Sequence, residues 1–279
     1  MSPVIRPAGA AEMPLLVEWA AAEGWNPGLA DAATFHAADA EGFLLAEVAG
    51  LPVACLSAVR QGRSMASSAS TSSARIGAER GLAGLVAGGH GAAGGARGGA
   101  GRRGGAAGEL RALRLRPGMA QCPLWGRGAA RRRWGGGGGG AGGLGALRRA
   151  RGAGCAGVPG ATRGAAARRL TAPGHRALAV RDGAGAVRGF GVLRPCREGA
   201  KIGPLTATGA PFARALFNAL AEGAPGPVFL DLPEPNAAAL ALAGEAGMAP
   251  AFETARMYRG PAPALPLDEI FGLMSFELG

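Results

Sequence analysis

The side chains that could support acid–base, covalent or metal chemistry are few and widely spaced. The four cysteines and three histidines match no zinc-binding spacing and form no CxxC pair, so no metal site is expected. Cys196 is interpreted as a small buried residue rather than a nucleophile. Asp231 and Glu253 could serve as general bases, although a single carboxylate near a strand is more commonly solvated. Residue type and spacing therefore assign no catalytic residue.

Composition divides the chain into unlike parts. The whole chain carries a net charge of +11, which taken alone suggests an anionic partner such as nucleic acid. Residues 62–171 contain nineteen arginines, 32 of the 52 glycines, no phenylalanine, and only Glu79 and Glu109 as acids. The positive charge therefore belongs to this one segment, and the flanking parts are mildly acidic overall.

Regular structure is predicted on both sides of that segment. In the N-terminal part, hydrophobic spacing predicts a strand, two helices and a hairpin, at residues 4–8, 12–24, 29–38, 43–48 and 53–59. In the C-terminal part it predicts strands at 176–182, 186–195, 200–207, 227–233 and 252–260, with helices at 211–223 and 236–248. Strands that alternate with helices indicate an α/β fold with helices packed on a mixed sheet.

Residues 62–171 show neither the period of a strand nor that of a helix. A segment rich in Gly, Arg and Ala buries too little apolar surface to offset chain entropy, so it is expected to be disordered. The predicted organisation is residues 1–61, the basic low-complexity segment 62–171, and residues 172–279.

Several stretches resemble the GNAT N-acetyltransferase superfamily, in a bacterial type with a second GNAT-like domain at the C-terminus. They are the strand–helix–helix–hairpin order of 1–60, RPCREGAKIGPL (194–205), LDLPEPNAAALALAGEAGMAPAFETARMY (230–258) and FELG (276–279). The resemblance implies two tandem GNAT-like units, of which the first is incomplete. It also implies acetyl-CoA as co-substrate and a small-molecule or peptide amine as acceptor.

The resemblance also suggests residues for the acceptor side. Trp25 and Asn26 lie in the predicted loop between the first two helices, which lines the acyl-acceptor pocket in related folds. The alternative roles are packing for Trp25 and capping for Asn26. Asn236 matches the asparagine that opens a late GNAT helix, and a purely structural N-cap is its alternative role. Catalytic and cofactor-binding residues remain unknown.

One expected motif is missing from this reading frame. GNAT proteins bind the acetyl-CoA pyrophosphate at an Arg/Gln-x-x-Gly-x-Gly/Ala turn that opens a helix. When the last base of each codon from Met65 to Leu85 is read with the first two of the next, allowed codons spell GFLGLYIVRPDWRGTGLGRA, which contains such a turn. From about Leu85 onward, a shift of the reading frame in the opposite direction gives a sequence that resembles the late part of a GNAT domain better. We interpret 62–171 as an out-of-frame translation, and we expect the chain as given to be inactive.

The alternative function is nucleic-acid binding through an Arg/Gly-rich arm. Such arms usually interleave aromatic residues for base stacking, whereas residues 62–171 contain only Trp125 and Trp134 as aromatics. Nucleic acid is therefore expected as a non-specific partner only. The N-terminal sequence does not resemble a signal peptide and no apolar run is long enough to span a membrane, so the expected location is the cytoplasm, without membrane partners.

Overall fold

The first unit begins with the predicted order of elements. The computed structural model describes residues 3–61, 65–72, 97–103, 116–127, 148–149, 170–251, 253–258 and 262–278. The elements of the first unit are β1 (Val4–Pro7), α1 (Met13–Ala22), α2 (Asp31–Ala38), β2 (Phe43–Val48), β3 (Leu51–Gln61), β4 (Met65–Ser72) and β5 (Arg97–Arg103). Strands β1 to β4 pair antiparallel, and β5 runs parallel to β4.

The second unit repeats this plan from its second strand onward. Its elements are β8 (Arg176–Arg181), β9 (Val187–Pro195), β10 (Ala200–Ala207), α6 (Ala210–Ala221), β11 (Pro227–Pro233), α7 (Ala237–Glu245), β12 (Ala249–Pro250), β13 (Thr254–Tyr258), the 3-10 helix η1 (Leu267–Glu269) and β14 (Ile270–Gly272). Strands β8, β9 and β10 are antiparallel neighbours, and β11 runs parallel to β10. The predicted strands and helices of this part are confirmed within a few residues at each end.

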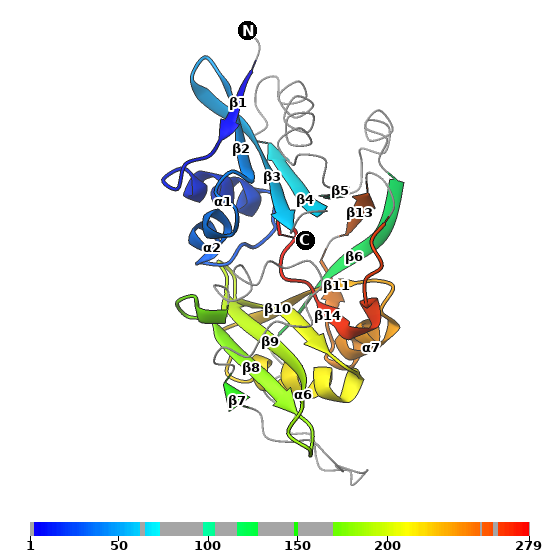
Figure 1. Cartoon of the computed structure of the whole chain (residues 1–279). Coiled ribbons are helices and arrows are strands. Elements are labelled where there is room, and N and C mark those ends of the chain that lie inside the picture. The colour runs from blue at the N-terminus through cyan, green and yellow to red at the C-terminus, as the bar shows by residue number, and fades with distance from the viewer. Residues whose placement is uncertain are drawn as a thin grey trace.

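The two units exchange strands. Strand β6 (Arg116–Arg127) pairs with β11 of the second unit, and β13 from the second unit pairs with both β5 and β6. With β7 (Arg148–Arg149), the described strands follow the order β1-β2-β3-β4-β5-β13-β6-β11-β10-β9-β8-β7, while β12 and β14 lie off this path and pair with β6 and β10. The sheets of the two units are therefore continuous (Figure 1).

Strands β4, β5, β6 and β7 lie inside the segment 62–171, for which the sequence predicts no regular structure. These strands can pair without a hydrophobic pattern, because the main-chain N–H and C=O groups form hydrogen bonds with a neighbouring strand whatever the side chains are. The partners β3, β11 and β13 come from the flanking parts of the chain. The rest of 62–171 lies outside the described residues.

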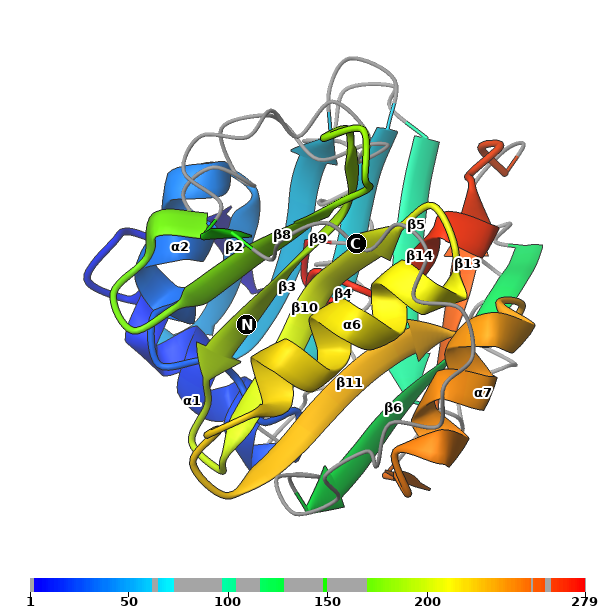
Figure 2. The same cartoon turned by 90° about the horizontal axis from the view of Figure 1, so that it is seen from below.

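Each unit has its own apolar core. In the second unit, α6 and α7 lie on one side of β9, β10 and β11 (Figure 2), and Leu205, Leu216 and Leu230 are fully buried between them. In the first unit, α1 and α2 pack on β2 and β3, where the Phe35 and Phe43 rings stack 5.6 Å apart. Burial of these side chains is the main term that stabilises both layers.

The C-terminal segment lies where β10 and β11 diverge. These strands pair in parallel only over residues 200–202 and 228–230. Farther along, β14 pairs antiparallel with β10, and the Leu273 amide donates to the Asp231 carbonyl of β11 at 2.7 Å. The segment then passes between the two units (Figure 1), where Met274 and Leu278 join the core of the first one.

Candidate functional site

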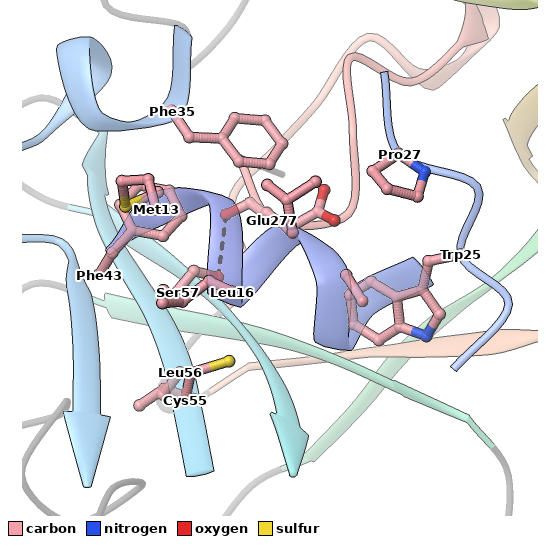
Figure 3. A pocket seen from close by; sticks show the side chains of 12 residues that line it. Met13, Leu16, Trp25, Pro27, Phe35, Phe43, Cys55, Leu56, Ser57 and Glu277 are labelled. Carbon is pink, nitrogen blue, oxygen red and sulfur yellow. Dashed lines mark hydrogen bonds between the residues drawn. The ribbon is translucent and has the colours of Figure 1, made fainter. Parts of the chain in front are cut away.

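A small pocket lies in the first unit between its helices and its sheet. Helices α1 and α2, strands β2 and β3 and the loop at Trp25 and Pro27 supply mainly apolar lining side chains (Figure 3). The cavity volume is about 30 Å³. Glu277, from the C-terminal segment, is the ionisable carboxylate of this lining, so the pocket combines side chains that lie more than 200 residues apart in sequence.

Glu277 is held against strand β3. The Ser57 hydroxyl donates to the Glu277 carbonyl oxygen at 3.2 Å, and this contact fixes the main chain beside the pocket. Burial raises the pKa of the Glu277 carboxyl, and the nearby Asp31 carboxylate raises it further. Arg194 and Lys201 act in the opposite direction without cancelling the effect. A carboxyl in such surroundings is suited to accept a proton or to pair with a cation.

A buried ion pair joins the units next to this pocket. Asp31 opens α2, and its Oδ2 atom lies 2.5 Å from Nη1 of Arg194 on β9. Both side chains are 2% exposed, so water screens this pair very little. The same Asp31 oxygen accepts the Gly28 amide at 2.7 Å. The contact therefore ties the loop between α1 and α2 to the second unit.

A second buried pair lies beside the first. Nζ of Lys201 is 2.9 Å from Oδ2 of Asp231 and donates to the Trp25 carbonyl at 3.3 Å. The same ammonium group lies 5.8 Å from the centre of the Phe276 ring. Within the described part of the chain, Asp231 Oδ1 and Arg194 Nε are buried without a hydrogen-bond partner. Buried polar atoms of this kind usually meet ordered water or a ligand.

Trp25 lies where the sequence places it, in the loop after α1. It is 6% exposed, lines the pocket, and packs edge-on against Phe276 with ring centres 6.3 Å apart. Its position on the acceptor side of the first unit stays a prediction. The packing of its ring against Phe276 is what the alternative role, side-chain packing, requires.

Asn26 docks this loop on the second unit. Its Nδ2 donates to the Glu198 carbonyl at 2.8 Å, and its Oδ1 accepts the Glu198 amide at 3.0 Å. The Leu29 amide donates to the Pro195 carbonyl, which extends the contact along the β9–β10 turn. The Asn26 backbone has φ of 49°, a left-handed conformation that asparagine tolerates better than most residues. The side-chain amide is thus engaged with the turn of the second unit.

Asn236 is the N-cap of α7. Its Oδ1 accepts the Ala239 amide at 3.0 Å, and its Nδ2 donates to the carbonyls of Leu267 and Ile270 at 3.0 and 2.9 Å. It therefore also fixes the turn that leads into β14. The structure does not bring Asn236 together with Trp25 and Asn26, which belong to the first unit.

Other candidate groups have structural surroundings. Cys196 is 6% exposed, and burial raises the pKa of its thiol, which disfavours the reactive thiolate. Asp231 is engaged with Lys201, and Glu253 is exposed. In the described ranges no cluster of three or more His, Cys, Asp or Glu side chains could hold a metal ion. None of the helices there is both long and apolar enough to cross a bilayer.

Comparison with solved structures shows the fold. A proposed acetyltransferase from Pyrococcus horikoshii matches with a TM-score of 0.73 and 15% identity, covering 100% of this chain and 96% of that one. A GCN5-related N-acetyltransferase from Sphaerobacter thermophilus matches with a TM-score of 0.63 and 14% identity over 96% and 98% of the two chains. A tandem GNAT protein of the clavulanic acid biosynthesis pathway matches with a TM-score of 0.58 and 15% identity over 94% and 100%. The chain thus has the tandem GNAT architecture.

The sequence itself also matches a family. Residues 157–272 match the family model described as the acetyltransferase (GNAT) domain. This part of the chain is therefore similar to the GNAT acetyltransferase domain. No significant match is found among curated proteins. The resemblance stated from the sequence is therefore confirmed, and strands β8 to β14 of the second unit lie within the matched range.

The GNAT resemblance did not identify the charged residues between the units. Asp31, Arg194, Lys201 and Glu277 became candidates only through their contacts in the fold. One signal was present in the sequence, because Lys201 is the only lysine of the chain and lies inside an apolar strand. A lone lysine in such a strand must find a carboxylate partner when it is buried.

Proposed function

We propose that this protein is built as an N-acetyltransferase, which transfers acetyl from acetyl-CoA to a small-molecule or peptide amine. The observation that carries the proposal is the fold, which matches the Pyrococcus horikoshii structure over the whole chain and a tandem GNAT protein over 94% of it. The family match over 157–272 supports it from sequence. The pocket on Trp25 and Glu277 supports placing the acceptor in the first unit.

Acetyl-CoA is assigned to the first unit as well. In the second unit β14 and Leu273 lie against the diverging strands β10 and β11, which leaves no open edge there. In the first unit β4 and β5 run parallel, as β10 and β11 do. Main-chain N–H groups at such a strand edge polarise an acyl carbonyl. Holding the amine and the thioester in line lowers the barrier further, because it removes the entropy cost of their encounter.

The chain as given is proposed to lack this activity. The segment 62–171 would carry the pyrophosphate-binding turn, and in the present frame that turn is replaced by Gly, Arg and Ala. Its positive charge would bind nucleic acid or CoA phosphates only non-specifically, and such binding weakens as salt rises. The proposed organisation is 1–61, 62–171 and 172–279, in a cytoplasmic protein.

The test compares two proteins side by side. One is the present chain, and the other has its coding frame restored across 62–171. We expect the restored protein to release CoA thiol from acetyl-CoA in the presence of a primary amine from a panel, and the present chain to release none above background. Sequencing the gene would show whether insertions or deletions shift the reading frame at the two ends of this segment. A restored protein that folds but neither binds acetyl-CoA nor releases thiol would refute the assignment.

A further inference from the structure

The last residues of the chain, 273–278, are held in place mainly by apolar side chains. Four of them are nearly inaccessible to water, each 5–7% exposed: Leu273, Met274, Phe276 and Leu278. Leu273 and Phe276 pack with Trp25, whereas Met274 and Leu278 belong to the core of the first unit. Docking of this segment therefore depends on burial of apolar surface.

Glu277 is the ionisable residue of this apolar segment. It is partly buried between Phe276 and Leu278 in sequence, and it lies among the apolar lining of the pocket, beside Leu16 and Phe35 (Figure 3). A protonated carboxyl group fits such surroundings, whereas an ionised one loses hydration without gaining a counter-ion. Docking of the segment and ionisation of Glu277 therefore oppose each other.

The charged groups around Glu277 are already paired with one another. Arg194 on β9 pairs with Asp31 on α2, and Lys201 on β10 pairs with Asp231 on β11. Among the described residues Glu277 forms no ion pair. The remaining titratable neighbours are the thiols of Cys55, in the pocket lining on β3, and of Cys196 after β9, while α1 contributes apolar side chains to the lining. Two cations thus face three carboxyl groups, and the charges balance only when one carboxyl carries a proton.

From these contacts we infer that residues 273–278 form a pH-dependent latch, which is docked while the Glu277 carboxyl is protonated and opens locally when it ionises. Burial, and then the Asp31 carboxylate, raise the pKa of Glu277, so the docked segment holds this proton more tightly than the open segment does. Docking is therefore strongest below the ordinary pKa of a glutamate and weakens as pH rises through the raised pKa.

The latch has a fixed point at its base. Strand β14 stays paired with β10, and the Asn236 side chain donates to the Ile270 carbonyl at 2.9 Å, so opening begins after Gly272. The contacts that open are those from the Leu273 amide to the Asp231 carbonyl and from the Ser57 hydroxyl to the Glu277 carbonyl.

Opening of the latch uncovers both units at once. It removes Glu277 from the pocket lining of the first unit. In the second unit it frees the place where β10 and β11 diverge, and it moves the Phe276 ring away from Lys201 Nζ, 5.8 Å from the ring centre. The buried pair of Lys201 and Asp231 then meets water. The latch thus couples the accessibility of the two units to pH.

The experiment measures hydrogen exchange of the Leu273 amide by NMR in the full chain, from about pH 4 to pH 8, corrected for the intrinsic pH dependence of exchange. We expect the opening constant to rise by up to about ten-fold per pH unit between the ordinary glutamate pKa of about 4.3 and the raised pKa, and to stay constant above it. The Leu230 amide on β11 reports global unfolding, and at pH 7 it should open far less often than that of Leu273.

Three variants separate the carboxyl group from the rest of the latch. Glu277→Gln is a neutral isostere of the protonated carboxyl, so it should keep the segment docked at pH 8 and abolish the pH dependence. Phe276→Leu removes the ring near Lys201 but keeps Glu277, so it should increase opening at every pH and retain the pH dependence. Glu222→Gln removes an exposed carboxylate of the second unit and should behave as the unchanged chain does.

The inference is overturned by any of three results. They are opening of Leu273 that does not change with pH, an unaltered pH dependence in Glu277→Gln, and opening of Leu273 at pH 7 that is no more frequent than that of Leu230. None of these measurements needs acetyl transfer, so their outcome is independent of the thiol-release test above.

Discussion

Nη1 of Arg194 lies 2.5 Å from Oδ2 of Asp31, and this buried ion pair joins the two units. Removal of one partner should be costly because it leaves the other charge buried and uncompensated. We predict that Arg194→Met lowers the free energy of unfolding in urea by about 3–5 kcal/mol. Adding Asp31→Leu to Arg194→Met should recover much of this loss.

The matched control is Arg197, whose ion pair with Glu18 is exposed. Exposed pairs contribute little because water and salt screen them, so Arg197→Ala should barely change the urea midpoint. If Arg194→Met and Arg197→Ala have equal effects, the buried pair does not stabilise the junction.

A second prediction concerns the loop at Asn26. Asn26→Gly keeps the left-handed backbone accessible but removes both hydrogen bonds to Glu198, so a loss of about 0.5–1.5 kcal/mol is expected. Asn26→Ala should lose about 1 kcal/mol more, because alanine at φ of 49° is strained. Thermal unfolding of both variants checks the order. An alanine variant more stable than the glycine variant would contradict the strain argument.

A third prediction concerns pH. The pKa of Glu277 is raised in the folded protein, so the folded state binds its proton more tightly than the unfolded state does. Stability therefore falls as pH rises from the unfolded pKa through the raised folded one. Glu277→Gln removes this term and should raise the melting temperature at pH 7 more than at pH 4. A variant that is destabilised at pH 7 would show that the carboxylate is stabilising in the folded state.

The opposite sign is expected for Asp39. Burial raises its pKa, but the hydrogen bonds and charge of Arg60 outweigh this, so the pKa is lowered overall. The stability from this pair is present above the unfolded pKa and is lost as pH falls through the folded one. Asp39→Asn should therefore destabilise the protein at pH 7 and have little effect near pH 3. Urea unfolding at both pH values checks this, and equal losses at both would contradict it.

A fifth prediction uses two glycines. A Cβ atom at Gly203 would lie 2.2 Å from the Leu273 carbonyl oxygen, so Gly203→Ala must displace the C-terminal segment. We expect a loss of about 1–3 kcal/mol, as for overpacked sites, and faster proteolysis of that segment. A Cβ atom at Gly244 in α7 would meet nothing within 4 Å, so Gly244→Ala should stabilise by about 0.5–1 kcal/mol. Equal effects of the two substitutions would argue against the tight contact.

Local pattern was enough to predict most of the elements outside 62–171. The helix over Met13–Ala22 and the strand over Pro227–Pro233 follow from apolar spacing, because one face or both faces of each are buried. Strand β14 has three residues, too few for a period to be visible, and its pairing with β10 depends on residues more than 60 positions away. Strand β4 was missed because its residues show no strand period, although its partner β3 is the preceding strand. Strands β5 and β6 were missed because composition does not show that the distant strands β13 and β11 pair with them.

The site was predictable only in part. Trp25 and Asn26 could be placed in the loop after α1 because Gly24 ends the helix. The contact of Asp31 with Arg194 joins residues 163 positions apart, and that of Ser57 with Glu277 joins residues 220 apart. Such contacts arise from the docking of the two units, which hydrophobic periodicity does not encode.

The strand exchange has a consequence for synthesis on the ribosome. The free edge of β5 receives β13 only about 150 residues later, and β6 receives β11 only about 100 residues later. During this interval the nascent first unit presents unpaired backbone groups and a pocket that still lacks Glu277. Vectorial folding of independent domains is therefore not open to this chain. The nascent protein should depend on chaperones that shield strand edges until its last strands are made.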